Sequence, residues 1–170
     1  MPQITNKQKL LIAAAIAAFI LMPMKKSYAE EFIIEQEGSH LTAYQDGGGV
    51  WTIGYGNTFN YDLNRPVRRG DTITEYQAIK YLRIAANQAT NDVLDLVDVP
   101  LNQNQLDSLT SFVFNIGRKQ FAGSTLLRKL NGGATKTEVA EEFDKWVFDN
   151  GVRVQGLVNR RKREKALFLK

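Results

Sequence analysis

The chain has 170 residues, of which 44% are hydrophobic and 24% are charged, values that fit one globular domain and exclude a disordered or fibrous protein. It contains no cysteine and a single histidine, which excludes disulfides and thiolate metal sites and argues against a histidine metal cluster or a Ser-His-Asp triad. Of the 22 basic residues, four are lysines in residues 1–29, which leaves 18 basic against 18 acidic side chains in the remainder. A nucleic-acid-binding domain carries a basic excess, so we expect no nucleic-acid partner.

The first 29 residues contain an apolar stretch, residues 10–24, with lysines on both sides. This stretch is shorter than the roughly 20 residues needed to cross a bilayer, and residues 27–29 form a small-x-small cleavage site. Three interpretations follow: a cleaved signal peptide, a releasable membrane anchor that contacts the membrane transiently, or a buried core helix. The apolar character on every face disfavours the core helix. The other two place residues 30–170 outside the cytoplasm.

Residues 30–37 predict a short helix that ends at Gly38, a residue suited to the position after a helix C-terminus. Ile33 and Ile34 precede Glu37 by four and three positions, so the carboxyl shares a helix face with apolar side chains. Such surroundings disfavour the charged form and raise the pKa of a carboxyl toward the range useful in a general acid. Taken alone, however, a glutamate at the end of a surface helix is more often only a solvated charge.

A second carboxylate, Asp46, stands before three consecutive glycines, where the backbone can turn without steric cost. Residues 50–56 are rich in β-branched and aromatic residues and predict a strand that carries Thr52. Gly54 and Gly56 indicate a place where a substrate or another backbone comes close. Two carboxylates and a hydroxyl, on a helix, a turn and a strand, are the groups needed to cleave a glycosidic bond.

The remaining residues predict helices. Thr74 and Gln77 have the spacing of a capping box that opens a long helix ending before Pro100. Further helices are expected from about Asn102 to Gly117, near residues 124–131, from Thr135 onward, and near the C-terminus. We expect most of the later aromatic side chains to lie in the core, namely Phe112, Phe114, Phe121, Phe143, Trp146 and Phe148.

The spacing Glu37-x8-Asp46-x5-Thr52 resembles the catalytic signature of the phage-type lysozymes, the endolysins of glycoside hydrolase family 24. Four other segments also resemble this family, in the right order along residues 31–170: residues 52–58, 100–117, 121–131 and 156–164. The short apolar leader is similar to that of the signal-anchor-release subgroup. Several members of that subgroup use cysteines for control, and this chain has none.

The resemblance implies an α+β, lysozyme-like fold. A small β-containing lobe (about 30–74) and a larger helical lobe (99–170) would be joined by a long helix (75–98), with a cleft between them and residues 1–29 as leader. The implied reaction is hydrolysis of the β-1,4 bond between N-acetylmuramic acid and N-acetylglucosamine in peptidoglycan, without cofactor or metal. The enzyme would be a monomer, exported across or anchored in the bacterial inner membrane and active in the periplasm, with a holin-type partner as a further possibility.

The resemblance also assigns roles to single residues. Glu37 becomes the general acid, Asp46 the base or electrostatic partner on the opposite face of the sugar, and Thr52 a holder of the attacking water. Such a positioned water favours inversion over a covalent, retaining route. The remaining implied site residues are Tyr55, Gly56 and Phe114 for substrate binding and Arg160 as the partner of the catalytic glutamate.

Three other functions compete with this one. A peptidoglycan-binding module that has lost catalysis would lack one of the acids, and both are present. A membrane-anchored interaction protein could use the acidic residues 30–46 and the basic residues 151–170, but the Glu–Asp–Thr spacing would then be coincidence. A lytic transglycosylase would attack the same bond with one acid and no need for Asp46.

The basic run 160–165 is most simply a solvated helix face, although it could meet the acidic cell wall.

Overall fold

The computed structural model describes residues 30, 31, 33, 34 and 38–170. The leader and Glu37 lie outside the described residues, and the boundary at residue 29 stays a prediction. The strands are β1 (His40–Gln45), β2 (Trp51–Gly54), β3 (Phe59–Asn60), β4 (Arg65–Pro66), β5 (Phe148–Asp149) and β6 (Val152–Arg153), and the helices are α3 (Glu75–Leu96), α4 (Gln103–Ile116), α5 (Arg118–Ala122), α6 (Thr125–Asn131), α7 (Lys136–Ala140), the 3₁₀ helix η1 (Glu141–Lys145) and α8 (Gln155–Phe168).

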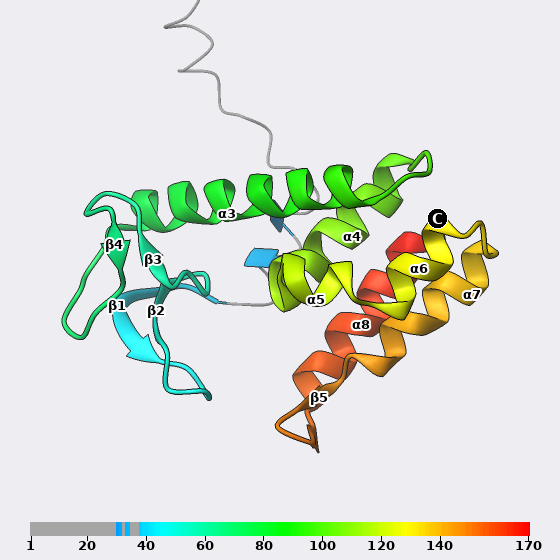
Figure 1. Ribbon diagram of the computed structural model, residues 1–170. Helices are drawn as coiled ribbons and strands as arrows, with labels where there is room; N and C mark the ends of the chain where they lie inside the picture. Colours follow the sequence, from blue (N-terminus) through cyan, green and yellow to red (C-terminus); the bar gives the residue numbers. More distant parts are fainter. Residues whose placement is uncertain (1–29, 32, 35–37) are drawn as a thin grey trace, which may run out of the picture.

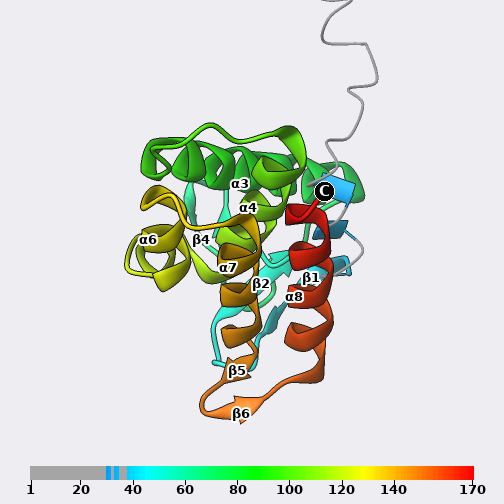
Figure 2. The same ribbon diagram turned by 90° about the vertical axis from the view of Figure 1, so that its right-hand side faces the viewer.

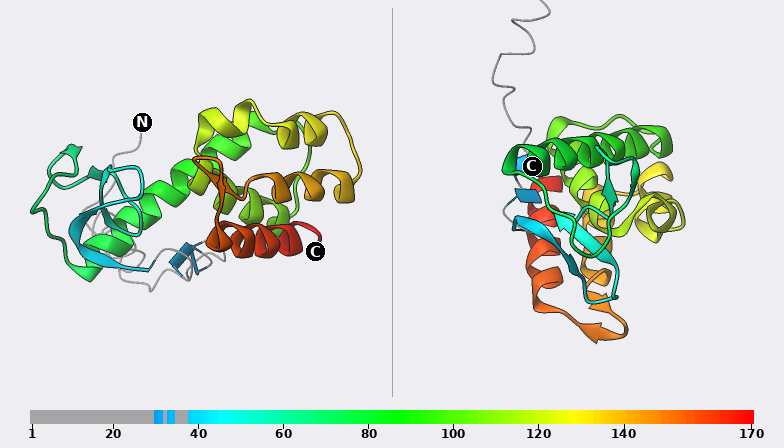
Figure 3. Two further views of the ribbon diagram at one scale, coloured as in Figure 1. Left: turned by 90° about the horizontal axis from the view of Figure 1, so that it is seen from below. Right: turned by 90° about the vertical axis from the view of Figure 1, so that its left-hand side faces the viewer.

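The chain forms two lobes of an α+β fold, and α3 joins them (Figure 1). The antiparallel pairs β1–β2 and β3–β4 lie at one end of α3, and the other helices lie at its other end. Seen from below, α3 runs from the strands into the helical lobe (Figure 3, left). None of the helices in the described part of the chain is both long and apolar enough to cross a bilayer.

The predicted helix ends are confirmed at three capping boxes. Thr74 caps α3 through the backbone N–H of Gln77, at 3.2 Å, and the Gln77 side chain accepts a hydrogen bond from the Thr74 N–H. The same reciprocal bonds begin α4 at Asn102 and α7 at Thr135. These patterns need only four consecutive residues, so the sequence specifies where each helix starts.

The small lobe packs directly on the first half of α3. Gly54 in β2 adopts φ +65°, and a Cβ built there would lie 3.3 Å from the Ile73 Cδ1 atom and 3.5 Å from the Ala78 backbone. The sequence predicted that either a substrate or another backbone comes close to Gly54. The structure shows the second case, with the Ala78 backbone as the neighbour. Ile53, Val67 and Tyr81 complete the buried cluster around this contact.

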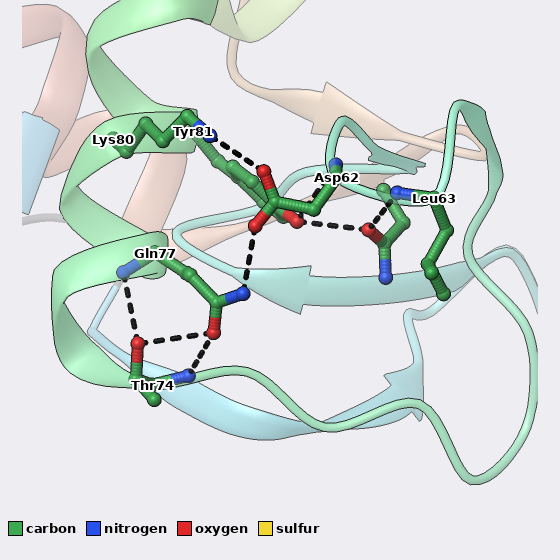
Figure 4. Close-up of polar contacts among 7 residues, drawn as sticks. Asp62, Leu63, Thr74, Gln77, Lys80 and Tyr81 are labelled. Atoms are coloured by element: carbon green, nitrogen blue, oxygen red, sulfur yellow. Dashed lines mark hydrogen bonds and ion pairs between the residues drawn. The ribbon is translucent and has the colours of Figure 1, made fainter.

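Polar contacts fix the loop between β3 and β4 onto α3 (Figure 4). Gln77 and Lys80 bind the two oxygens of Asp62 at 2.7 and 2.5 Å, and the Tyr81 hydroxyl donates to Asn60 Oδ1 at 2.8 Å. The hydrogen bonds from Lys80 and Gln77 lower the pKa of Asp62. As a result, the small lobe is held to α3 by its core on one side and by this charged loop on the other.

The core of the helical lobe is aromatic. Phe112, Phe121 and Phe143 are fully buried as predicted, with edge-to-face contacts from Phe112 to each of the other two. The prediction is wrong for Phe148, whose side chain is 57% exposed, because it lies on a two-residue strand outside the helices. Phe114 and Trp146 pack against the core and are only partly buried.

The prediction of a solvated basic face is wrong for Arg160 and Arg161 on α8. They are 4% and 0% exposed, and Glu164, which is also 0% exposed, lies between their guanidinium groups. Arg161 Nε approaches Glu164 Oε2 at 2.6 Å, and Arg160 Nε donates to Oε1 at 3.2 Å. Lys162 and Arg163 are exposed, in agreement with the prediction.

This buried cluster joins α8 to α4. Ser111 on α4 donates to Glu164 Oε1 at 2.7 Å, and its carbonyl accepts from Arg160 Nη2 at 3.2 Å. Burial raises the pKa of the Glu164 carboxyl, while the charges of Arg161 and Arg160 and the Ser111 hydroxyl oppose that rise. Buried charges need such partners, so the cluster determines how the two helices meet.

Candidate active-site cleft

Asp46 organises the turn between β1 and β2. Its Oδ1 atom accepts hydrogen bonds from the backbone N–H groups of Gly48 and Val50, at 2.9 and 2.8 Å. Its own N–H donates to the Val50 carbonyl at 3.0 Å, which closes the turn. The backbone of the turn therefore holds the carboxylate in place, and Asp46 is exposed to solvent.

Thr52 lies on β2 next to this turn. Its side chain is 3% exposed, and its hydroxyl donates to the Val50 carbonyl at 3.1 Å. Thr52 pairs with Tyr44 across the β1–β2 ladder. Because neighbouring strands are about 4.8 Å apart, this pairing brings Tyr44 into the same group of side chains.

A hollow of about 230 Å³ brings these residues together with the helical lobe. Its lining residues are Tyr44, Asp46, Thr52, Gly56, Phe114 and Asn115. The structure thus places four of the predicted site residues in one hollow. Tyr44 and Asn115 were not predicted. Tyr44 could have been found by pairing the two predicted strands, which places it opposite Thr52. The sequence signal for Asn115 is weaker: it is a polar residue next to Phe114, near the end of an apolar helix.

The hollow continues in two directions. On one side it shares Gly56 and Phe114 with a second hollow of about 230 Å³ that Tyr61 and Gln88 also line. On the other side it shares Asp46 and Asn115 with a third hollow of about 620 Å³. The three hollows form one cleft between the lobes, with Asp46 and Thr52 in its middle part.

Glu37 lies outside the described residues, so only its neighbours can be described. Ile33 is fully buried against Leu82 and Ala86 of α3, and Ile34 packs against the same cluster. Phe114 also packs against this cluster. Gly38 adopts φ +62°, the left-handed conformation expected after a helix. The described residues before Glu37 therefore lie beside one wall of the cleft.

Two further predicted residues lie near this region. Tyr55 is half-buried and packs against the clusters around Ile53 and Ile33, so its contact with substrate stays a prediction. Arg160 bonds the Ser111 carbonyl, one helical turn before Asn115. The pairing of Arg160 with Glu37 stays a prediction, because Glu37 lies outside the described residues. Within the described ranges, no group of three or more His, Asp or Glu residues could hold a metal ion.

Comparisons with known proteins agree with this geometry. The family model for phage lysozyme matches residues 34–164. An endolysin of Acyrthosiphon pisum secondary endosymbiont phage 1 is 46% identical over 136 residues, which cover 78% of this chain and 88% of the relative. A SAR-endolysin of Escherichia phage 933W is 33% identical over 165 residues and 92% of both chains. The muramidase domain of SpmX from Asticaccaulis excentricus has a TM-score of 0.74 and 37% identity, covering 85% of this chain and 97% of that domain.

Proposed function

The chain belongs to the phage lysozyme family and is a peptidoglycan-hydrolysing glycosidase, and from this premise we propose that it is an N-acetylmuramidase. It hydrolyses the β-1,4 bond between N-acetylmuramic acid and N-acetylglucosamine and thereby lyses bacterial cells. The observation that carries this proposal is the single hollow shared by Asp46, Thr52 and the helical-lobe residues Phe114 and Asn115.

In the proposed reaction, Glu37 protonates the oxygen of the leaving sugar. Asp46 acts from the opposite face of the ring, as the base toward water or as a negative charge beside the developing oxocarbenium ion. The Thr52 hydroxyl, which is fixed on β2, holds the attacking water. The backbone N–H groups that bind Asp46 Oδ1 hold the carboxylate in a fixed position for this role. A water held between Asp46 and the sugar leads to inversion of the anomeric carbon.

Asp46→Asn is expected to lower kcat for peptidoglycan hydrolysis by about 10²–10⁴-fold, the usual contribution of an acid or base. An asparagine keeps an oxygen that can accept from Gly48 and Val50, so the turn is expected to survive. The measurement is release of reducing ends from purified peptidoglycan, with mass analysis of the products. The matched control is Asp144→Asn, a change at an exposed carboxylate on η1.

Products that contain an anhydro ring in place of a reducing end would instead indicate a lytic transglycosylase. Such an enzyme needs no Asp46, so clear retention of cleavage in Asp46→Asn would contradict the mechanism proposed above. If wild type binds peptidoglycan but does not cleave it, the result would point to a binding module.

We further propose that residues 10–24 anchor the enzyme in the inner membrane and that it acts in the periplasm after release. The SAR-endolysin of phage 933W aligns with 92% of this chain, which supports an anchor over a cleaved signal. Mass spectrometry of exported protein is expected to give the full-length chain, and a chain that begins at Glu30 would contradict the anchor. The released enzyme is expected to be more active than the anchored form, with a holin-type partner as the trigger.

One chain supplies both walls of the proposed site. Asp46 and Thr52 come from the small lobe, and Phe114 and Asn115 come from the helical lobe. The cleft is therefore complete without a second copy, and we propose that the active enzyme is a monomer.

A further inference from the structure

The cleft extends beyond the catalytic hollow toward the β5–β6 hairpin. We propose that this hairpin builds an additional subsite for a sugar of the same glycan strand, with the Phe148 ring as its stacking surface. This inference rests on the proposed muramidase function. It concerns a hairpin that contains none of the proposed catalytic residues.

The hairpin presents Phe148 in a defined position. β5 and β6 pair antiparallel, with Phe148 opposite Arg153, and a two-residue turn of Asn150 and Gly151 joins them. Both turn residues have positive φ, at 47° and 79°, as in the tight turns that match the twist of paired strands. The Val154 N–H donates to the Val147 carbonyl at 2.9 Å, which extends the ladder to the body of the lobe.

The hairpin projects beyond the end of α8 (Figure 2). It lies on the same lower side of the molecule as the β1–β2 turn (Figure 1). The hollow of about 620 Å³ is lined from both, by Asp46 of the turn and by Phe148 of the hairpin. Phe148 is 57% exposed, so a large apolar ring faces solvent beside the cleft. Val154, which is 37% exposed, lines the same hollow and adds to this apolar surface.

The lining of this hollow suits an acetamido sugar. Trp146 and Phe148 provide aromatic surface, and Asn115 and Gln120 provide carboxamides. The carboxamides can donate to and accept from sugar hydroxyl and acetamido groups, while Asp149 adds an acceptor. The volume of about 620 Å³ lies within the usual range of ligand pockets. Such pockets usually combine a small number of polar groups with apolar surface, as this hollow does.

Continuity with the catalytic hollow identifies the occupant. The two hollows share Asp46 and Asn115, so a strand that places a bond beside Asp46 extends into the hollow at the hairpin. The next sugar of that strand arrives there by covalent connection. Its binding adds to the affinity of the catalytic hollow without the cost of a separate association. A peptide branch attached to the strand is the alternative occupant, and the experiment separates the two.

The test compares wild type with Phe148→Ala on glycan strands of defined length, prepared both without and with their peptide branches. Phe148→Ala is expected to lower kcat/KM on long strands by about three- to tenfold, the usual value of one aromatic contact. The loss on the shortest cleaved fragments is expected to be smaller, since fewer of them reach the hairpin. Phe148→Tyr retains the ring and is expected to restore most of the activity on long strands.

Val152→Ala is the matched control. Val152 lies on the partner strand of the same hairpin, is 66% exposed, and does not line the hollow. It is expected to leave kcat/KM unchanged, and urea unfolding checks that all variants keep the wild-type stability. Equal activity of Phe148→Ala and wild type on long strands would overturn the subsite. A loss seen only on peptide-bearing strands would assign the hollow to the peptide. If wild type cleaves no glycan, the muramidase function itself fails.

Discussion

Glu37→Gln is expected to abolish lysis of permeabilised Gram-negative cells, with a loss in kcat of about 10²–10⁴-fold. A glutamine side chain has the shape of the glutamate side chain but no acidic proton, so the leaving sugar would depart as an unprotonated alkoxide. Binding of peptidoglycan should persist, because the rest of the cleft is unchanged. The measurement is the fall in turbidity of permeabilised cells, together with release of reducing ends from purified peptidoglycan.

The matched control for this variant is Glu31→Gln. Glu31 is helical and exposed, so its replacement is expected to leave lysis unchanged. Urea unfolding should give Glu31→Gln a free energy of unfolding within about 0.5 kcal/mol of wild type, as is usual for surface changes, and the same measurement shows whether Glu37→Gln is folded. Normal lysis by a folded Glu37→Gln enzyme would remove the assignment of the whole site.

The largest expected effect on stability comes from Glu164→Ala. This change leaves Arg160 and Arg161 buried beside each other without the carboxylate that both contact at present. Removing one partner of a buried ion pair costs about 3–5 kcal/mol, because the remaining charge is left uncompensated. The Ser111 hydroxyl loses its acceptor as well. Urea unfolding at neutral pH measures the change directly.

Asp144→Ala provides the comparison on the same pair of elements. Asp144 on η1 pairs with Lys165 on α8 at 2.6 Å, but its side chain is 53% exposed. An exposed pair contributes at most about 1 kcal/mol, so this variant should unfold close to wild type. Equal losses in Glu164→Ala and Asp144→Ala would show that the buried cluster has no special role in joining α8 to α4.

The sequence predicted those features whose causes lie within a few neighbouring residues. The capping residues Thr74, Asn102 and Thr135 each bond a residue three positions later, so the helix starts could be read directly. Asp46 and Thr52 likewise belong to one turn and its strand. Their spacing predicted that the two residues share a site, and both line the same hollow.

Features that depend on distant residues were missed. Arg161 and Glu164 have the spacing of an exposed helical ion pair, and only the contact with Ser111, 53 residues earlier, reveals their burial. Asn115 lines the cleft because α4 faces the small lobe, which no local pattern shows. The hairpin is a different case. Asn150-Gly151 is a strong hairpin signal, and reading it would have placed Phe148 outside the core.

The long helix α3 also determines the mechanics of the enzyme. Both walls of the cleft are attached to this one helix of 22 residues, which contains neither glycine nor proline and so lacks the usual kink sites. A change in cleft width must then be spread over about 33 Å of helix instead of being concentrated at one joint. Because α3 offers no such joint, it acts as a stiff connection that holds the two walls of the cleft at a set spacing.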